Sequence, residues 1–141
     1  MPNIHPLIVH LPITLLTFSF LFDFLGLLAK KEQFERTAWW GFLAGTIGLL
    51  LSVATGLSAE SSTIISDAAR EHFDSHQQLA FAVTGLYSFL LFWRVASRTK
   101  LPLSKQKAFV TLSFLGVILI WTTAWYGGEL VYRFGVGVSI P

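Results

Sequence analysis

The 141-residue chain contains no cysteine and a single methionine. Disulfides, iron–sulfur clusters, thiolate metal sites and covalently attached c-type haem are therefore excluded, because each needs a cysteine sulfur. Charge is scarce as well: charged residues make up 13% of the chain, about half the fraction of an ordinary soluble domain. No segment resembles a glycine-rich phosphate loop or the nucleophile motif of a hydrolase. We therefore expect a protein that is not an enzyme.

Hydrophobic residues are abundant, at 53% of the chain, and they gather in four long runs at 7–29, 38–57, 79–96 and 108–126. Each run has about the length needed to cross a hydrocarbon core of about 30 Å. Backbone groups in lipid must pair within their own segment, so the runs predict helices. The predicted fold is all-α: a polytopic four-helix transmembrane bundle, up-down-up-down, with residues 1–141 as one membrane domain.

The basic residues predict how this bundle is oriented. Eight of the ten fall next to two of the three connections: Lys30, Lys31, Arg36, Arg94, Arg98, Lys100, Lys105 and Lys107. The positive-inside rule places these connections in the cytoplasm and both termini in the periplasm of a bacterial inner membrane. The opening lacks the basic region and cleavage site of a signal peptide, so we expect the first run to be retained as a helix. We expect lipid contact and no nucleic-acid partner, because the membrane topology already accounts for the basic loops.

All four histidines fall on the predicted periplasmic side. His5 and His10 flank the start of the first run, and His72 and His76 precede the third. Histidine is rare where a membrane helix begins, and neutral imidazole is a ready metal ligand. We expect His10 and His76 to point into the bundle at similar depth, from helices that run in the same direction.

Two converging imidazoles suit b-type haem, whose iron takes histidine as an axial ligand. On this hypothesis His5 and His72 hydrogen-bond the ligands or face the propionates, Trp125 forms part of an aromatic wall, and Arg133 meets a propionate. An ordinary interfacial aromatic belt explains Trp125 equally well. Small side chains near the same depth are expected to leave room for a flat macrocycle: Thr55, Gly56, Ala59, Ala124, Gly127 and Gly128.

Two other interpretations remain open. Residues 67–78 have helical character, and Ser66 or Asp67 could cap that helix. His72 and His76, four residues apart, share one face of it, so they could chelate a bare metal ion, with His5 or His10 completing the shell. Alternatively, the chain is a cofactor-free accessory subunit whose apolar faces pack against a larger respiratory or photosynthetic complex.

One acid lies inside an apolar run. Asp23 is sixteen residues beyond Leu7, about 24 Å along a helix, and Arg94 is fifteen residues beyond Leu79, about 22.5 Å along another. An unpaired charge in hydrocarbon is costly, so we predict that Asp23 and Arg94 form a pair near the cytoplasmic face.

Two stretches are more specific than composition: His5-Pro-Leu-Ile-Val-His-Leu-Pro-Ile13 and Gly127-Gly-Glu-Leu-Val-Tyr-Arg-Phe-Gly-Val-Gly-Val138. Together with His76, they resemble the bacterial membrane family of domain of unknown function 2231. That resemblance implies a four-helix protein in which His5, His10 and His76 are the positions to carry over. Many relatives have histidine where this chain has Phe134, so a ligand used there by others is missing here.

Members of that family are sometimes joined to cytochrome c or Rieske-type domains, which implies a place in periplasmic-side electron transfer. Combined with the histidine pattern, this gives the leading prediction: a small inner-membrane b-haem electron-transfer protein or subunit. Its expected partners are other membrane or periplasmic electron-transfer proteins.

Overall fold

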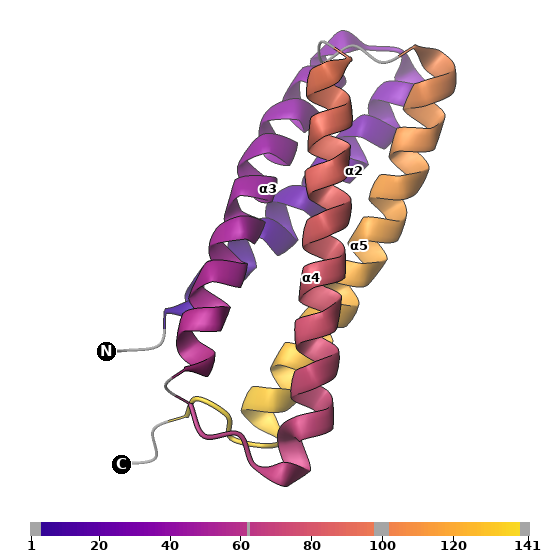
Figure 1. The fold of residues 1–141 in the computed structure, drawn as a ribbon. Helices are drawn as coiled ribbons and strands as arrows, with labels where there is room; N and C mark the ends of the chain where they lie inside the picture. The colour runs from indigo at the N-terminus through magenta and orange to yellow at the C-terminus, as the bar shows by residue number, and fades with distance from the viewer. Residues whose placement is uncertain (1–3, 62, 98–101, 139–141) are drawn as a thin grey trace.

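The computed structural model describes residues 4–61, 63–97 and 102–138, and every regular element in those ranges is a helix. The elements in chain order are α1 (His5–Ile8), α2 (His10–Ala29), α3 (Glu32–Glu60), α4 (Asp67–Ala96) and α5 (Leu103–Tyr132). Because α1 and α2 together form one span, these ranges contain four segments long and apolar enough to cross a membrane. The beginning of α1 and the end of α5 lie at the same end of the bundle (Figure 1). The predicted all-α four-span fold is confirmed.

The helices extend beyond the apolar runs that predicted them. The largest difference is in α4, which begins at Asp67 rather than at the start of the run 79–96, so its first three turns are polar. Between α2 and α3 the turn is short: Lys30 adopts a left-handed conformation (φ 52°) and its N–H donates to the Gly26 carbonyl, as at many helix ends. Arg98 and Lys100, assigned above to the next basic connection, lie outside the described residues.

The first span is interrupted at Val9, and the cause is Pro12. Proline has no N–H to donate to the carbonyl four residues earlier, here that of Ile8, and its ring crowds that carbonyl. Accordingly α1 ends at Ile8 and α2 begins at His10. The short helix α1 packs against α3 as well as against α2. Val9 itself keeps helical backbone angles (φ −61°, ψ −26°), so His5, seven residues before Pro12, stays on the same face of the span as Pro12.

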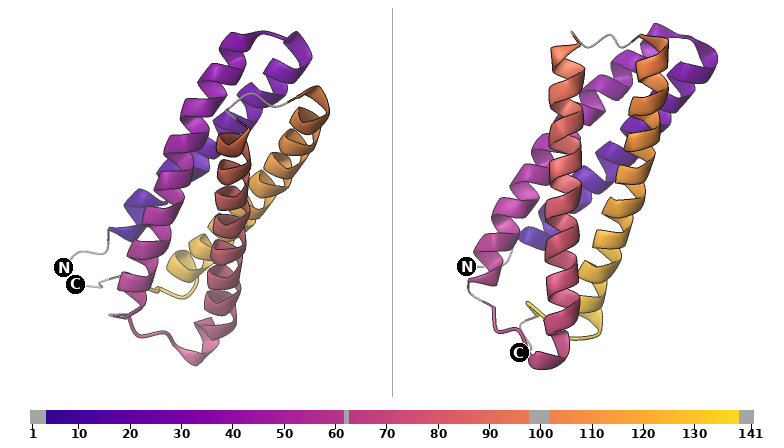
Figure 2. Two further views of the ribbon diagram at one scale, coloured as in Figure 1. Left: turned by 45° about the horizontal axis from the view of Figure 1, so that its top comes forward. Right: turned by 45° about the vertical axis from the view of Figure 1, so that its right-hand side comes forward.

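The bundle is built from two close pairs of helices, α2 with α3 and α4 with α5. Their shared core consists of Leu16, Phe42, Leu49, Val83, Tyr87, Leu90, Phe109 and Ile120. Toward the end at which α1 begins, α3 and α4 separate (Figure 1 and the right view of Figure 2). Large apolar side chains on the outer faces are exposed, as expected for helices that contact lipid.

The predicted Asp23–Arg94 pair is confirmed at the other end of the bundle. Arg94 Nη1 lies 2.7 Å from Asp23 Oδ2, and the two side chains are 5% and 8% exposed. Arg94 Nη2 also donates to the Glu35 carbonyl at 3.2 Å. The guanidinium lies over three aromatic rings, those of Trp39, Phe42 and Phe109. The pair therefore connects α2, α3, α4 and α5 through one buried charge cluster.

Candidate functional site

Two of the four histidines face each other at the end of the bundle where α1 begins. The ring centroids of His5 and His76 are 6.4 Å apart, and their planes are nearly perpendicular at 82°. His10 is not part of this pair, because its side chain is exposed on the outside of α2. The prediction that His10 and His76 converge is therefore wrong for His10. The histidine that contacts His76 is His5.

The reason lies in the buried face of α2. Its buried residues recur at alternating steps of four and three: Pro12, Leu16, Ser19, Asp23 and Gly26. His10 precedes Pro12 by two positions, which is about 200° around a helix, so it points away from the bundle. The threonine on its own face, Thr17, donates to the Ile13 carbonyl and accepts from Trp121 Nε1. Thr17 therefore does not mark a polar interior of the bundle beside His10.

His5 is held by α3. Its Nδ1 lies 3.1 Å from Thr55 Oγ1. The Thr55 hydroxyl lies within hydrogen-bonding distance of the carbonyls of Leu51 and Ser52, at 2.9 and 3.1 Å. Its single hydrogen is directed to those carbonyls, so Oγ1 accepts a hydrogen from His5 Nδ1. Gly56 adjoins the same ring: a Cβ there would lie 3.1 Å from His5 Cε1.

His76 is held by α5 in a similar way. Its Nδ1 lies 2.9 Å from the backbone carbonyl of Thr123. A carbonyl can only accept, so Nδ1 must carry the hydrogen. Gly127, one helical turn further along α5, adjoins the ring, and a Cβ there would lie 3.0 Å from His76 Cε1. Both histidines thus pack on a glycine and donate from Nδ1, which assigns the lone pair of each neutral ring to Nε2.

These contacts change the interpretation of the small residues. The space that glycine leaves at positions 56 and 127 is filled by the imidazole rings themselves rather than kept open for a macrocycle. Gly128, by contrast, has nothing within 4 Å of a Cβ built there. Thr123 was not singled out in the sequence, since a backbone carbonyl acceptor leaves no sequence signal.

The other predicted site residues are not members of this pair and contact other side chains. His72 packs against Tyr126 and Phe134, with ring centroids 5.7 and 4.9 Å away. Trp125 is 58% exposed on the outer side of α5 and contacts Tyr126 at 5.0 Å. Arg133 is exposed, lies over the Phe134 ring, and pairs with Glu129 at 3.3 Å. An aromatic contact therefore occupies position 134, where many relatives are expected to have histidine.

The structure does not assemble the bare-ion site. Across residues 4–61, 63–97 and 102–138, no group of three or more histidine, cysteine, aspartate or glutamate side chains could hold a metal ion. His72 is engaged with aromatic rings, and Glu60 accepts from Gln77 Nε2 at 2.8 Å.

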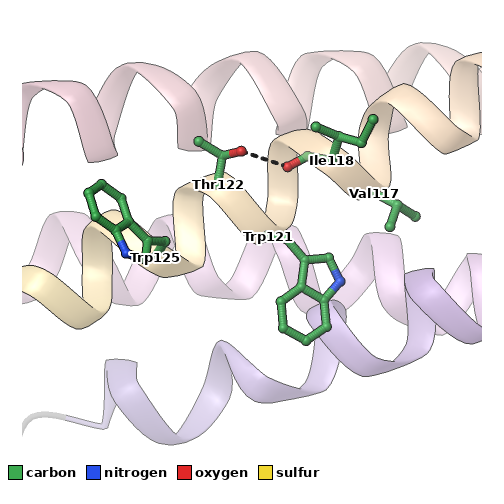
Figure 3. A pocket seen from close by; sticks show the side chains of 5 residues that line it. All are labelled: Val117, Ile118, Trp121, Thr122 and Trp125. Atoms are coloured by element: carbon green, nitrogen blue, oxygen red, sulfur yellow. Dashed lines mark hydrogen bonds between the residues drawn. The ribbon is translucent and has the colours of Figure 1, made fainter.

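A shallow groove of about 490 Å³ lies on the outer face of α5. Figure 3 shows its lining residues, which all come from this one helix: Val117, Ile118, Trp121, Thr122 and Trp125. Thr122 donates to the Ile118 carbonyl at 2.8 Å, so its hydroxyl hydrogen is already used. The groove offers mainly apolar and indole surface.

The fold and site define a multi-pass membrane protein with four spanning helices and an imidazole pair at one end. Residues 1–140 match the family described as "predicted membrane protein (DUF2231)", and the chain belongs to that family. The resemblance recognised in the two end motifs and His76 is thereby confirmed. No curated protein and no solved structure matches the chain.

Proposed function

We propose that this protein is a small electron-transfer protein or subunit of the bacterial inner membrane, and that His5 and His76 are the axial ligands of a haem b. The observation that carries the proposal is the facing pair of imidazoles, 6.4 Å apart and nearly perpendicular. The protein's part is to hold the group and to exchange single electrons through it, without catalysis of its own.

The spacing suits one metal between two rings. Metal–imidazole bonds of about 2.0–2.1 Å, plus roughly 1.1 Å from each nitrogen to its ring centre, place two centroids about 6.3 Å apart. The observed 6.4 Å has the size of this sum for two rings in line with the metal, and it is also the distance of an ordinary edge-to-face ring contact. Haem iron receives four nitrogens from its macrocycle and needs only two from the protein. Zinc, by comparison, takes three or four protein ligands.

The hydrogen bonds at Nδ1 also favour metal ligation. Histidines that bind metals usually donate their other ring N–H to an oxygen, which fixes the tautomer and makes the ligating nitrogen more basic. His5 donates to Thr55 and His76 to the Thr123 carbonyl. Both rings are therefore in the tautomer in which Nε2 can bind iron.

The position of the pair suits a flat group. His5 belongs to α1, which packs on α2 and α3, and His76 to α4, which packs on α5, so the ring pair joins the two halves of the bundle. Arg133 lies at the same end, over the Phe134 ring and in a largely exposed pair with Glu129. Such exposed pairs are weak, so Arg133 remains our candidate for a propionate, with His72 and Trp125 as flanking groups. Exchange would take place with membrane or periplasmic redox proteins at this end.

An absorption spectrum of the purified protein tests the proposal. We expect a Soret band and, after dithionite reduction, the sharp α band of low-spin haem. His5→Ala and His76→Ala should each abolish the reduced α band. His10→Ala and His72→Ala are the matched controls and should retain it, because neither ring belongs to the facing pair.

A colourless protein from haem-replete cells would overturn the proposal, and so would loss of the band in His10→Ala with retention in His5→Ala. In the first case the accessory-subunit alternative takes its place. The groove on the outer face of α5 is the feature that favours that alternative, since it would accept an apolar helix of a partner. Comigration with a larger complex on native gels would then be the test.

A further inference from the structure

We infer that four residues on α3 and α5 are positioning residues for the histidine pair, and that they set its geometry and its electronic properties. Thr55 and Gly56 form what we term the α3 seat of His5. Thr123 and Gly127 form the α5 seat of His76. This inference concerns the same site as the proposed function, but its first test needs no haem.

Each seat combines a hydrogen-bond acceptor with one missing side chain, and His5 has a further hydrogen bond to the Ser52 backbone. In the α3 seat the acceptor is Thr55 Oγ1, 3.1 Å from Nδ1. In the α5 seat it is the Thr123 carbonyl, 2.9 Å from Nδ1. The acceptor fixes the rotation of the ring about its χ2 bond, and the glycine allows the ring to approach the helix backbone. The two together determine where each Nε2 points.

Contact with the glycines is close enough for one methyl group to disturb it. A Cβ at Gly127 or Gly56 would stand 3.0 or 3.1 Å from the adjoining Cε1, below an ordinary van der Waals separation of about 3.5–4.0 Å. The ring would have to move by a few tenths of an ångström. Gly128 provides a matched control, because a Cβ there meets nothing within 4 Å.

The acceptors have an electronic consequence besides a geometric one. An oxygen that accepts from Nδ1–H makes the ligating Nε2 more basic, and a more basic axial ligand favours ferric over ferrous iron. Thr55 acts through a side chain, so it can be removed without changing the backbone. Valine keeps the shape of threonine and removes the acceptor, while serine restores it.

The first experiment measures the histidine tautomers by ¹⁵N NMR of the histidine-labelled protein, without haem and at mildly alkaline pH, where imidazole is neutral. In the wild type we expect both His5 and His76 as Nδ1–H tautomers. Thr55→Val should change the signals of His5 and leave those of His76. Gly127→Ala should change those of His76, and Gly128→Ala should change neither.

Two results would overturn the inference: a wild-type His5 or His76 with its hydrogen on Nε2, or a Thr55→Val protein whose His5 signals are unchanged. Far-ultraviolet circular dichroism on each variant separates misfolding from a local effect. Thr55→Ser provides a rescue. Because serine restores the acceptor oxygen, the His5 signals should return to their wild-type positions.

The second experiment uses the haem-loaded protein. Thr55→Val should raise the reduction potential, and Thr55→Ser should return it toward the wild-type value. Gly127→Ala should weaken haem retention by about 10–100-fold, and Gly128→Ala should not.

If the wild type binds no haem, the proposed function fails, while the tautomer measurement still decides whether the seats position the rings. If it binds haem and the Thr55→Val potential is unchanged, only the electronic part of the inference fails.

Discussion

At the scale of single residues, glycine has two roles in this bundle, and alanine substitution separates them. Gly116 lies against the buried Tyr87, and a Cβ there would lie 2.8 Å from two atoms of that ring. Gly116→Ala should therefore lower the free energy of unfolding by about 1–3 kcal/mol, the usual cost of overpacking a core. Reversible unfolding by SDS in mixed micelles measures it.

Gly85→Ala is the control for that substitution. A Cβ at Gly85 meets nothing within 4 Å, so the variant should unfold at the wild-type SDS fraction or slightly above it, since alanine is the better helix former. Equal destabilisation of Gly116→Ala and Gly85→Ala would show that the packing of Gly116 against Tyr87 does not contribute to the free energy of unfolding.

A contact between two residues could be predicted from the sequence where their depths along straight helices were enough to bring them together. The Asp23–Arg94 pair follows from two distances along straight helices and the cost of an unpaired charge in lipid, and it is present. The partner of His76 depends on which side of the first span a residue faces. His5 lies seven residues before the buried Pro12 and shares its face, whereas the prediction weighed depth and neighbouring residues, so His10 was chosen where the structure has His5.

At the scale of helices, the buried Asp23–Arg94 pair connects α2 to α4. Asp23→Asn leaves a buried guanidinium without its carboxylate, a loss that typically costs about 3–5 kcal/mol. We expect reduced accumulation of the protein in membranes and an earlier SDS transition, with no change in any haem spectrum. Quantitative immunoblotting of membranes and the same SDS titration measure these effects.

The exposed pair of Glu129 and Arg133 is the control for that variant. Its side chains are 27% and 63% exposed, so Glu129→Gln should change stability by no more than about 0.5 kcal/mol. Wild-type accumulation of Asp23→Asn would mean that the buried pair does not join α2 to α4 energetically.

Pro12 removes one hydrogen bond between α2 and the last carbonyl of α1, close to the turn that carries His5. Pro12→Ala restores an N–H that can donate to the Ile8 carbonyl, which should make the first span continuous and draw His5 away from Thr55 and Gly56. The ¹⁵N signals of His5 should change as they do in Thr55→Val. Pro6→Ala is the control, since proline is tolerated in the first turn of α1. An unchanged His5 in Pro12→Ala would contradict this account of the break.

Four spans could be predicted because run length and apolar content suffice to specify a membrane helix, and the structure has them. The polar first turns of α4, residues 67–78, were predicted from helical character and a capping residue rather than from hydropathy, and α4 does begin at Asp67 after Ser66. They extend the helix from Asp67 to the level of His76, and hydropathy does not register a helix outside the apolar run. Thr55, Gly56 and Gly127 were singled out as small residues at this depth, but their contact with the imidazole rings was not predicted, because a close approach to a missing Cβ is a property of packing.

At the scale of the whole molecule, the two ends of the bundle differ in charge and in chemistry. The end with the connection between α2 and α3 carries Lys30, Lys31 and Arg36, and the opposite end carries the histidine pair. The positive-inside rule predicts that the basic end faces the cytoplasm. The histidine pair would then lie at the periplasmic side, where the proposed redox partners are.

The absence of native cysteine makes this orientation directly testable. Three exposed, uncharged positions are suitable for single cysteines: Ser66 at the histidine end, and Gln33 and Ser104 at the basic end. With a membrane-impermeant maleimide on spheroplasts, Ser66→Cys should label at once. Gln33→Cys and Ser104→Cys should label only after lysis. The reverse pattern would place the imidazole pair on the cytoplasmic side and assign its electron exchange to partners there, while leaving the haem-ligand proposal intact.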